Sequence, residues 1–214
     1  MRGGTDHLPL LHDRLLRYQE RTGSTSRDYT LHLSYSGGRT IRVFEATFKG
    51  IDVGRCNLIS NGPVVYLETN HPLTTSEFLP FYRQIWVDEE ASSGASWVDE
   101  DMATETVFAG FETVSVPAGN FPDCYKTVTT TLPGFADSLR VRLGRGELRD
   151  RDYQREKANA GLVIIRWFAR DVGLVKEQLG SSEHVRELVE VVRPGRGEKN
   201  ILVSMPPDSQ DVQE

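Results

Sequence analysis

The chain has 214 residues and a mass of 24.1 kDa, with 25 Lys+Arg against 31 Asp+Glu and therefore a formal net charge of -6. This acidic balance argues against nucleic acid as a partner, because proteins that neutralise phosphates carry a basic surface. Apolar residues make up 38% of the chain, which is enough for a folded core. We expect one domain over 1–193, followed by a polar extension over 194–214 in which Gly and Pro are frequent.

Leu8, Leu11, Leu15 and Tyr18 recur at helical spacing near the N-terminus. They follow Asp6, a residue type that caps helices, so the sequence predicts a short helix there. No run approaches the ~20 apolar residues that cross a bilayer, and the opening residues MRGG do not begin an export signal. The sequence alone thus predicts neither a membrane span nor an export signal.

From residue 29 onward the dominant period is two, which is typical of strands. Residues 29–35 alternate, Gly37 and Gly38 follow, and alternation resumes at 40–44, which predicts a β-hairpin. Residues 185–191 fit a helix or a strand, and their valines favour the strand. Residues 74–79 are expected to form one helical turn. Further strands are expected over 64–67, 105–116, 125–132, 162–169 and 174–178.

These strands are separated by turn residues and not by amphipathic helical stripes of ten residues. Parallel strands need such crossover helices, so the sequence predicts antiparallel pairing. The predicted fold class is all-β, an antiparallel curved sheet or open half-barrel with at most short helices. Its core is expected to hold large aromatic side chains, namely Trp97, Trp167, Phe168, Phe111 and Tyr125.

Two cysteines, Cys56 and Cys124, are too far apart in sequence for a zinc ribbon or a CxxC redox site. They fit either two buried thiols or one disulfide bond. Residues 86–90 (WVDEE) and 97–101 (WVDED) form a near-repeat around a Ser-Ser-Gly turn. This spacing predicts a hairpin that brings two acidic clusters together, either as solvated side chains or as a calcium site.

Sequence signatures of common enzymes are missing: there is no GxSxG, HExxH or GxxxxGK[ST], and no GxGxxG opens a helix. The five histidines, at positions 7, 12, 32, 71 and 184, are scattered singly. A pair of catalytic carboxylates that meets only in the folded protein would leave no such signature. On balance we expect no enzyme, no catalytic residue, no cofactor and no metal site.

A segment between residues 140 and 157 is rich in arginine, with acidic residues interleaved. The mixed charges are typical of a solvated hairpin extension or a short helix with weak ion pairs. They also suit a protruding arm that contacts an acidic protein partner or anionic lipid headgroups, because guanidinium groups bind carboxylate and phosphate. The candidate partner-binding residues are Arg140, Arg142, Arg145, Arg149, Arg151 and Arg155.

Three motifs carry a family resemblance: VPAGNF at 116–121, the aromatic pair Trp167 and Phe168 followed by GLVK at 173–176, and GASW at 94–97. Over about residues 8–192 the chain resembles the bacterial DUF3108/TapB-like group of β-rich proteins. The chain departs from the group in its opening segment, in Arg170 and Asp171, which stand where a small residue and Gly are usual, and in its longer arginine-rich stretch. The resemblance implies an antiparallel β domain similar to lipoprotein-carrier folds, an extracytoplasmic peripheral location and no catalytic residues.

Two functions follow as expectations. The first is a non-catalytic interaction or scaffold protein, an accessory peripheral subunit of a larger, membrane-associated bacterial assembly. The alternative is an extracytoplasmic carrier that holds a lipid or another apolar ligand on a concave β face. Turn chemistry alone explains the two glycine motifs, because Pro117 presets φ while Gly119 and Gly173 accept positive φ.

Overall fold

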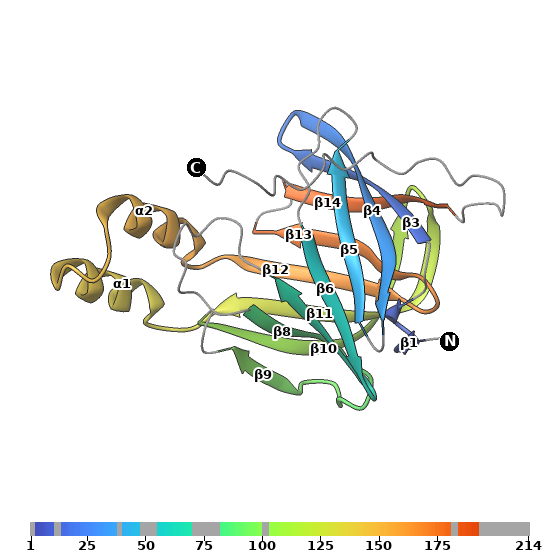
Figure 1. Cartoon of the computed structure of the whole chain (residues 1–214), viewed down its shortest axis with the longest axis horizontal. Coiled ribbons are helices and arrows are strands. Elements are labelled where there is room, and N and C mark those ends of the chain that lie inside the picture. Colours follow the sequence, from blue (N-terminus) through green and yellow to red (C-terminus); the bar gives the residue numbers. More distant parts are fainter. Residues whose placement is uncertain are drawn as a thin grey trace, which may run out of the picture.

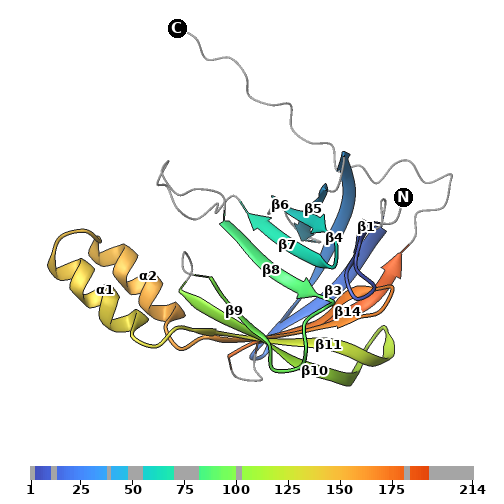
Figure 2. The ribbon, with the colours of Figure 1, turned by 90° about the horizontal axis from the view of Figure 1, so that it is seen from below.

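The computed structural model describes residues 3–10, 14–37, 40–47, 55–69, 82–99, 103–180 and 184–192. Within these residues, twelve strands form one antiparallel sheet that curls around an interior (Figures 1 and 2). The first half comprises β3 (Arg14–Thr22), β4 (Thr25–Gly37), β5 (Thr40–Thr47), β6 (Arg55–Asn61), β7 (Val64–Thr69) and β8 (Tyr82–Asp88). The second half comprises β9 (Ser96–Asp99), β10 (Thr104–Val116), β11 (Gly119–Thr131), β12 (Val163–Ala169), β13 (Gly173–Leu179) and β14 (His184–Val192). The all-β class is therefore confirmed.

Strand order places sequence neighbours side by side everywhere except where β3 pairs with β14. The order runs β8-β7-β6-β5-β4-β3-β14-β13-β12-β11-β10-β9, so β8 and β9 are the two edges. The sheet curls until these edges approach, and the Trp97 Nε1 group donates a hydrogen bond to the Ile85 carbonyl at 3.2 Å. Figure 2 shows the two halves of the sheet facing each other across the interior.

The predicted N-terminal helix is wrong. Residues 3–10 form two short strands, β1 (Gly3–Gly4) and β2 (Pro9–Leu10), and β3 begins at Arg14. Burial alternates along β3, where Arg14, Leu16, Tyr18 and Glu20 are buried. Because two of these inward residues are charged, the alternation is not visible as a pattern of hydrophobicity, and the remaining leucines imitate a helical stripe.

The other predicted strands are confirmed, including the hairpin of β4 with β5 and the strand β14. The helical turn predicted at 74–79 and the extension at 194–214 lie outside the described residues. In the described part of the chain, none of the helices combines the length and the apolar character needed to cross a membrane.

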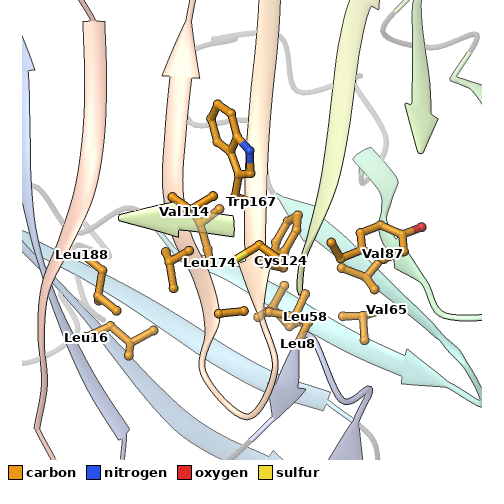
Figure 3. Close-up of a cluster of buried hydrophobic side chains, with 14 of the residues drawn as sticks. Leu8, Leu16, Leu58, Val65, Val87, Val114, Cys124, Trp167, Leu174 and Leu188 are labelled. Atoms are coloured by element: carbon orange, nitrogen blue, oxygen red, sulfur yellow. The ribbon is translucent and has the colours of Figure 1, made fainter. Parts of the chain in front are cut away.

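Buried side chains of both halves pack into one core (Figure 3). Trp167, Phe168 and Tyr125 belong to it, as predicted, and Trp97 packs against it while half-buried. Phe111 is 58% exposed, so its predicted burial is wrong. Its ring contacts the rings of His7, Phe108 and Tyr125, with centroids 5.3–6.0 Å apart, while the rest of the side chain remains exposed.

The VPAG motif forms the two-residue turn between β10 and β11. This hairpin curls towards β14, where the Ala118 N–H donates to the Leu188 carbonyl at 3.0 Å. A register shift in the pairing of β14 with β3 lies at that point, between Leu188 and Glu190. Such a bulge locally interrupts strand pairing, and here the turn supplies a donor to the adjoining carbonyl. The motif therefore docks the long hairpin onto the sheet.

Candidate functional site

The arginine-rich segment folds as two short helices, α1 (Phe135–Gly144) and α2 (Asp150–Asn159), between β11 and β12. They project beyond the sheet as an arm (Figure 1). Leu139 is 1% exposed and Tyr153 is 9% exposed, so a small apolar contact holds the pair together. Neither helix has a wide apolar stripe, which is why sequence periodicity does not distinguish a helix from a hairpin here.

Five of the predicted partner-binding arginines are exposed on this arm: Arg140, Arg142, Arg145, Arg149 and Arg151. Arg155 belongs to α2, but its side chain is outside the described part. Four of the exposed residues, Arg142, Arg145, Arg149 and Arg151, lie at or beside the connection between the helices, and we call them the arginine tip.

The ion pairs recorded for the exposed arginines of the arm join residues close in sequence. The Arg145–Glu147 and Arg151–Asp152 pairs are each 3.9 Å apart. Arg140 lies closer to Asp137, at 2.9 Å, with both side chains mostly exposed. Arg142 and Arg149 have no carboxylate partner among the described residues. Exposed pairs of this kind contribute little to stability, so these charges are available to another molecule.

Charge is distributed unevenly between the arm and the rest of the protein. Residues 135–159 contain seven of the 25 Lys+Arg but only five of the 31 Asp+Glu. The arm therefore carries a net charge of +2, and the remainder of the chain carries -8. The arm is a cationic projection on an acidic protein.

The interior face of the sheet carries a row of five charged side chains on five adjacent strands. In register order this charge ladder is Arg166, Glu177, Arg186, Glu20 and Arg27. Directly opposed residues lie on the same face of a sheet. The Trp86 ring of β8 lies 5.2 Å from the Arg166 guanidinium and 5.8 Å from the Phe168 ring, so this face points across the interior.

Each carboxylate of the charge ladder lies between two guanidinium groups. Glu177 Oε2 accepts from Arg166 Nε at 2.7 Å, and its Oε1 lies 3.4 Å from Arg186. Glu20 accepts from Arg27 Nε at 2.7 Å. Burial alone would raise the pKa of both glutamates, but the surrounding positive charges outweigh it and hold each pKa below its ordinary value. Both carboxylates of the charge ladder are therefore paired, and its three arginines leave it with a net charge of +1.

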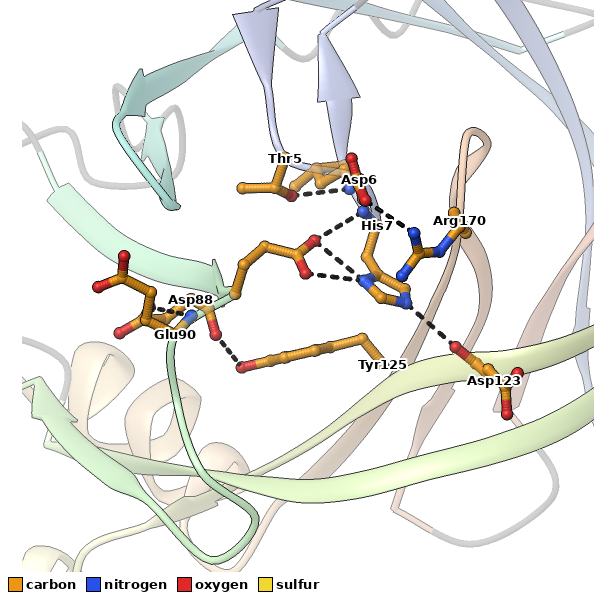
Figure 4. Close-up of polar contacts among 10 residues, drawn as sticks. Thr5, Asp6, His7, Asp88, Glu90, Asp123, Tyr125 and Arg170 are labelled. Atoms are coloured by element: carbon orange, nitrogen blue, oxygen red, sulfur yellow. Dashed lines mark hydrogen bonds and ion pairs between the residues drawn. The ribbon is translucent and has the colours of Figure 1, made fainter.

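A second polar cluster lies at the opposite end of the sheet from the arm, around His7 (Figure 4). His7 is 1% exposed. Its backbone N–H donates to Glu89 Oε1 at 2.7 Å, and its Nδ1 lies 2.9 Å from the same oxygen. Its Nε2 lies 3.1 Å from the Asp123 carbonyl oxygen. His7 thus joins the N-terminal segment to the end of β8 and to the β10–β11 hairpin.

The hydrogen bonds of His7 determine the ionisation of Glu89. Burial would raise the pKa of Glu89, but the bonds from the His7 side chain and backbone outweigh it and hold the pKa below its ordinary value. No short sequence pattern reveals this contact, because the two residues are 82 positions apart.

Several further carboxylates surround the His7 cluster, and we call them the acidic rim. Its members are Asp6, Asp88, Glu90, Asp123 and Asp171. Asp6 pairs with Arg170 at 2.8 Å, and its carbonyl accepts the Asp171 N–H. Glu90, Asp123 and Asp171 are exposed, and no cation pairs with them within the described ranges.

The hairpin predicted between the two Trp-acidic repeats is wrong, because β8 and β9 pair with β7 and β10 and not with each other. Trp97 of β9 still reaches β8 at the seam between the two sheet edges, through its hydrogen bond to the Ile85 carbonyl. No group of three His, Cys, Asp or Glu side chains in the described part of the chain could hold a metal ion. Glu100 and Asp101 lie outside that part.

Cys124 is a free, fully buried thiol, so the alternative of a disulfide with Cys56 is not realised. Its Sγ donates to the Phe121 carbonyl at 3.4 Å. Burial raises the pKa of the thiol to about 11, which makes it a structural residue and a poor nucleophile.

No family model matches the chain, and no curated protein matches its sequence. A candidate lipoprotein from Parabacteroides distasonis ATCC 8503 is 13% identical, with 89% of this chain and 100% of that chain covered and a TM-score of 0.48. A candidate exported protein with a YmcC-like fold from Bacteroides fragilis NCTC 9343 is 12% identical, with coverage of 89% and 98% and a TM-score of 0.52. At such low identity the second likeness shows the fold alone, and the resemblance to the DUF3108/TapB-like group is not matched by a family model.

Proposed function

We propose that this protein is a non-catalytic, extracytoplasmic interaction protein that docks through the arginine tip of its arm, as an accessory peripheral subunit of a larger bacterial assembly. The observation that carries the proposal is the exposure of Arg142 and Arg149 without a carboxylate partner among the described residues. Arginine is enriched at protein interfaces, where its guanidinium group can form two parallel hydrogen bonds with one carboxylate. The extracytoplasmic location is supported by the structural neighbour from Bacteroides fragilis, which is described as a candidate exported protein.

The alternative of a carrier for a lipid or other apolar ligand has less support. A carrier of this kind needs an apolar concave face, whereas the interior here presents the charge ladder across five strands. Trp86 and Phe168 also pack against each other across the interior. An apolar ligand would have to displace this contact and bury the paired charges of the ladder.

Capture from native membranes of the source organism tests the docking proposal. The tagged full chain is compared with Arg142→Ser/Arg149→Ser at low and moderate salt. We expect the wild type to retain a defined protein partner and the variant to lose it. Retention should weaken as salt rises, because exposed charges act over a Debye length of about 8 Å at physiological ionic strength.

Arg17→Ser/Arg21→Ser is the matched control, because it removes two exposed arginines that pair with Glu190 and Glu187 away from the arm. The control should capture the partner as the wild type does. Thermal unfolding of the arm variant should remain close to that of the wild type. Equal capture by the arm variant and the wild type would refute a docking role for the arm.

A further inference from the structure

We propose that the arginine tip of one copy of this chain docks on the acidic rim of another copy, so that the protein associates head to tail. This inference rests on the proposed function, because it takes the arginine tip as a contact surface, and it adds the identity of the partner. The partner is a second copy of the chain, recognised by pairing of guanidinium groups with carboxylates.

The two surfaces lie at opposite ends of the molecule. Strand β12 leaves the arm at Val163 and ends at Ala169, directly before Arg170 and Asp171. Seven residues of strand span about 23 Å. β11 likewise runs from the hairpin that carries Asp123 to the start of the arm. Figure 1 accordingly shows the arm at one end of the long axis and the N-terminal segment at the other.

The acidic rim exposes unpaired carboxylates. Glu90, Asp123 and Asp171 are exposed without a cation partner in the described ranges, while Asp6 is paired with Arg170. At the arginine tip, Arg142 and Arg149 are similarly exposed without a carboxylate partner there. The charges that each surface leaves unpaired are therefore opposite in sign.

The mosaic of charges at the arm favours a protein partner over a membrane. Glu147 and Asp150 lie among the tip arginines and would be repelled by a uniformly anionic lipid surface. Among the described side chains of the arm, Val141 is the one large apolar side chain that is exposed, at 51%, so insertion into lipid would gain little. The rest of the same chain is the most direct partner of complementary charge, because it carries a net charge of -8 while the arm carries +2.

Head-to-tail contact uses two different surfaces, so each added copy leaves one arginine tip and one acidic rim open. Such heterologous contacts build rings or open chains and not closed two-fold dimers. The contact consists of a few exposed ion pairs, which are individually weak. We therefore expect a concentration-dependent association that anchoring of the copies on a common surface would strengthen.

Charge exchange between the two surfaces tests the inference. The tip variant is Arg142→Glu/Arg149→Glu. The rim variant is Glu90→Lys/Asp123→Asn/Asp171→Asn, with Asn because the positive φ of 50° at position 123 and of 59° at position 171 suits Asn or Asp. Sedimentation velocity over a concentration series reports the average mass against 24.1 kDa for one chain, and circular dichroism confirms that each variant is folded.

We expect the wild type to exceed the monomer mass as concentration rises and each variant alone to associate at least about tenfold more weakly. An equimolar mixture of the two variants should recover association, because the tip then carries two carboxylates and the three unpaired rim positions carry one positive charge and no negative one. A mixture of the rim variant with Arg17→Glu/Arg21→Glu, which has the same net charge as the tip variant, should not recover it. Monomers at every wild-type concentration, or equal recovery in the control mixture, would overturn the inference.

The docking function proposed above can be tested separately, even if the protein does not self-associate. If the wild type stays monomeric while membrane capture still depends on the arginine tip, the partner is another protein and the inference alone is wrong. A vesicle experiment provides a further test. The inference would also be overturned if the wild type bound vesicles of equal parts phosphatidylcholine and phosphatidylglycerol, did not bind phosphatidylcholine alone, and lost this binding in the tip variant. That result would assign the arm to an anionic lipid surface.

Discussion

At the scale of single residues, His7 has the most consequential contacts, because one buried side chain connects three segments distant in sequence. His7→Ala removes the imidazole contacts with the half-buried Glu89 carboxylate and leaves only the backbone N–H of residue 7 as a donor from this position. Hydrogen bonds to charged groups contribute about 1.5–3 kcal/mol, so we expect a loss of about that size in the free energy of unfolding. Urea denaturation measures it.

Arg170→Ala is the control for that change, because it removes the exposed pair with Asp6 at the same end of the sheet. Exposed pairs contribute little, so its midpoint in urea should stay near that of the wild type. If the two variants lost equal stability, the contacts of His7 would have no special role.

Cys124 provides a second test at the residue scale. Its thiol is buried and its pKa is raised to about 11, so at pH 8 it should resist alkylation in the folded protein. In a Cys56→Ser background, mass spectrometry after iodoacetamide treatment should find no adduct without denaturant and one adduct with it. Because the raised pKa disfavours the thiolate in the folded state, this thiol also weakens stability as pH rises from about 9 towards 11. Rapid alkylation of the native protein would contradict the burial.

Sequence reasoning identified some residue roles and missed others for specific reasons. Trp167, Phe168 and Tyr125 could be placed in the core because large aromatic side chains bury most area. Phe111 could not be placed correctly, since its ring contacts the core only at Phe108, Tyr125 and the distant His7 and is otherwise exposed. His7 looked like one scattered histidine, because its partner Glu89 is distant in the chain and meets it only after the sheet has curled.

At the scale of elements, Gly173 explains why the GLVK motif begins with glycine. Its φ is +101°, and a Cβ there would lie 3.3 Å from Leu8 Cδ1 of the N-terminal segment. Gly119, with φ of +141°, has no atom within 4 Å of such a Cβ. Gly173→Ala should therefore lower the unfolding temperature more than Gly119→Ala, since backbone strain of about 1–3 kcal/mol acts in both and crowding acts in one. Equal shifts in calorimetry would show that crowding by Leu8 is negligible.

The arm should be dispensable for folding. Thr130 pairs with Val163, so replacing residues 132–161 by Asn-Gly would join β11 and β12 through a two-residue hairpin turn. We expect a folded protein that loses helical signal in far-UV circular dichroism and keeps cooperative unfolding. Near-UV signals from tryptophan should be retained, because the buried Trp167 lies outside the deleted segment. An aggregated or non-cooperative product would mean that the arm supports the sheet.

Strands were predictable from sequence where apolar and polar residues alternate along them, as in the hairpin of β4 and β5. The start of the chain misled because β3 turns Arg14 and Glu20 inward. Those charges are stable there through contacts that sequence does not show: Arg14 donates to the Asp171 and Val172 carbonyls, and Glu20 accepts from Arg27. The arm was expected as a projection, but its two helices lack the apolar stripe that would have identified them.

At the scale of the whole molecule, three carboxylates link stability to pH. Glu20, Glu89 and Glu177 each have a pKa held below the ordinary value of 4.5 by hydrogen bonds and positive charges that outweigh burial. As pH falls, the unfolded chain takes up these protons first, so their contribution is present above about 4.5 and is lost below it. Urea midpoints should therefore be nearly constant near neutral pH and fall below that value.

Glu177→Gln isolates one of these contributions. It leaves Arg166 and Arg186 beside a neutral amide, so stability at neutral pH should drop by about 3 kcal/mol or more. The decline of stability with acid should also become shallower, because one proton-linked group is gone. An unchanged slope would show that other carboxylates control acid unfolding.

The all-β architecture was predictable, whereas its closure and its charge polarity were not. Alternation gives strands, but the pairing of β3 with β14 joins residues more than 150 positions apart and leaves no local signal. The same holds for the interior charge ladder and the acidic rim, whose members come from separate turns and strands. For the candidate site, the sequence supplied the arginines but not the surface at the other end.

The strand order also determines how this chain can fold. In the large sheet, consecutive strands are hydrogen-bonded to each other, except that β8 and β9 are not paired. Each half can therefore form from local hairpins with little loss of loop-closure entropy. Only the β3–β14 pairing requires the two ends of the chain to meet. The sheet is a nearly continuous ring of successive hairpins that is interrupted between β8 and β9, and its two halves are joined covalently there by residues 89–95. Formation of this one long-range pairing is therefore the step in which topology slows folding.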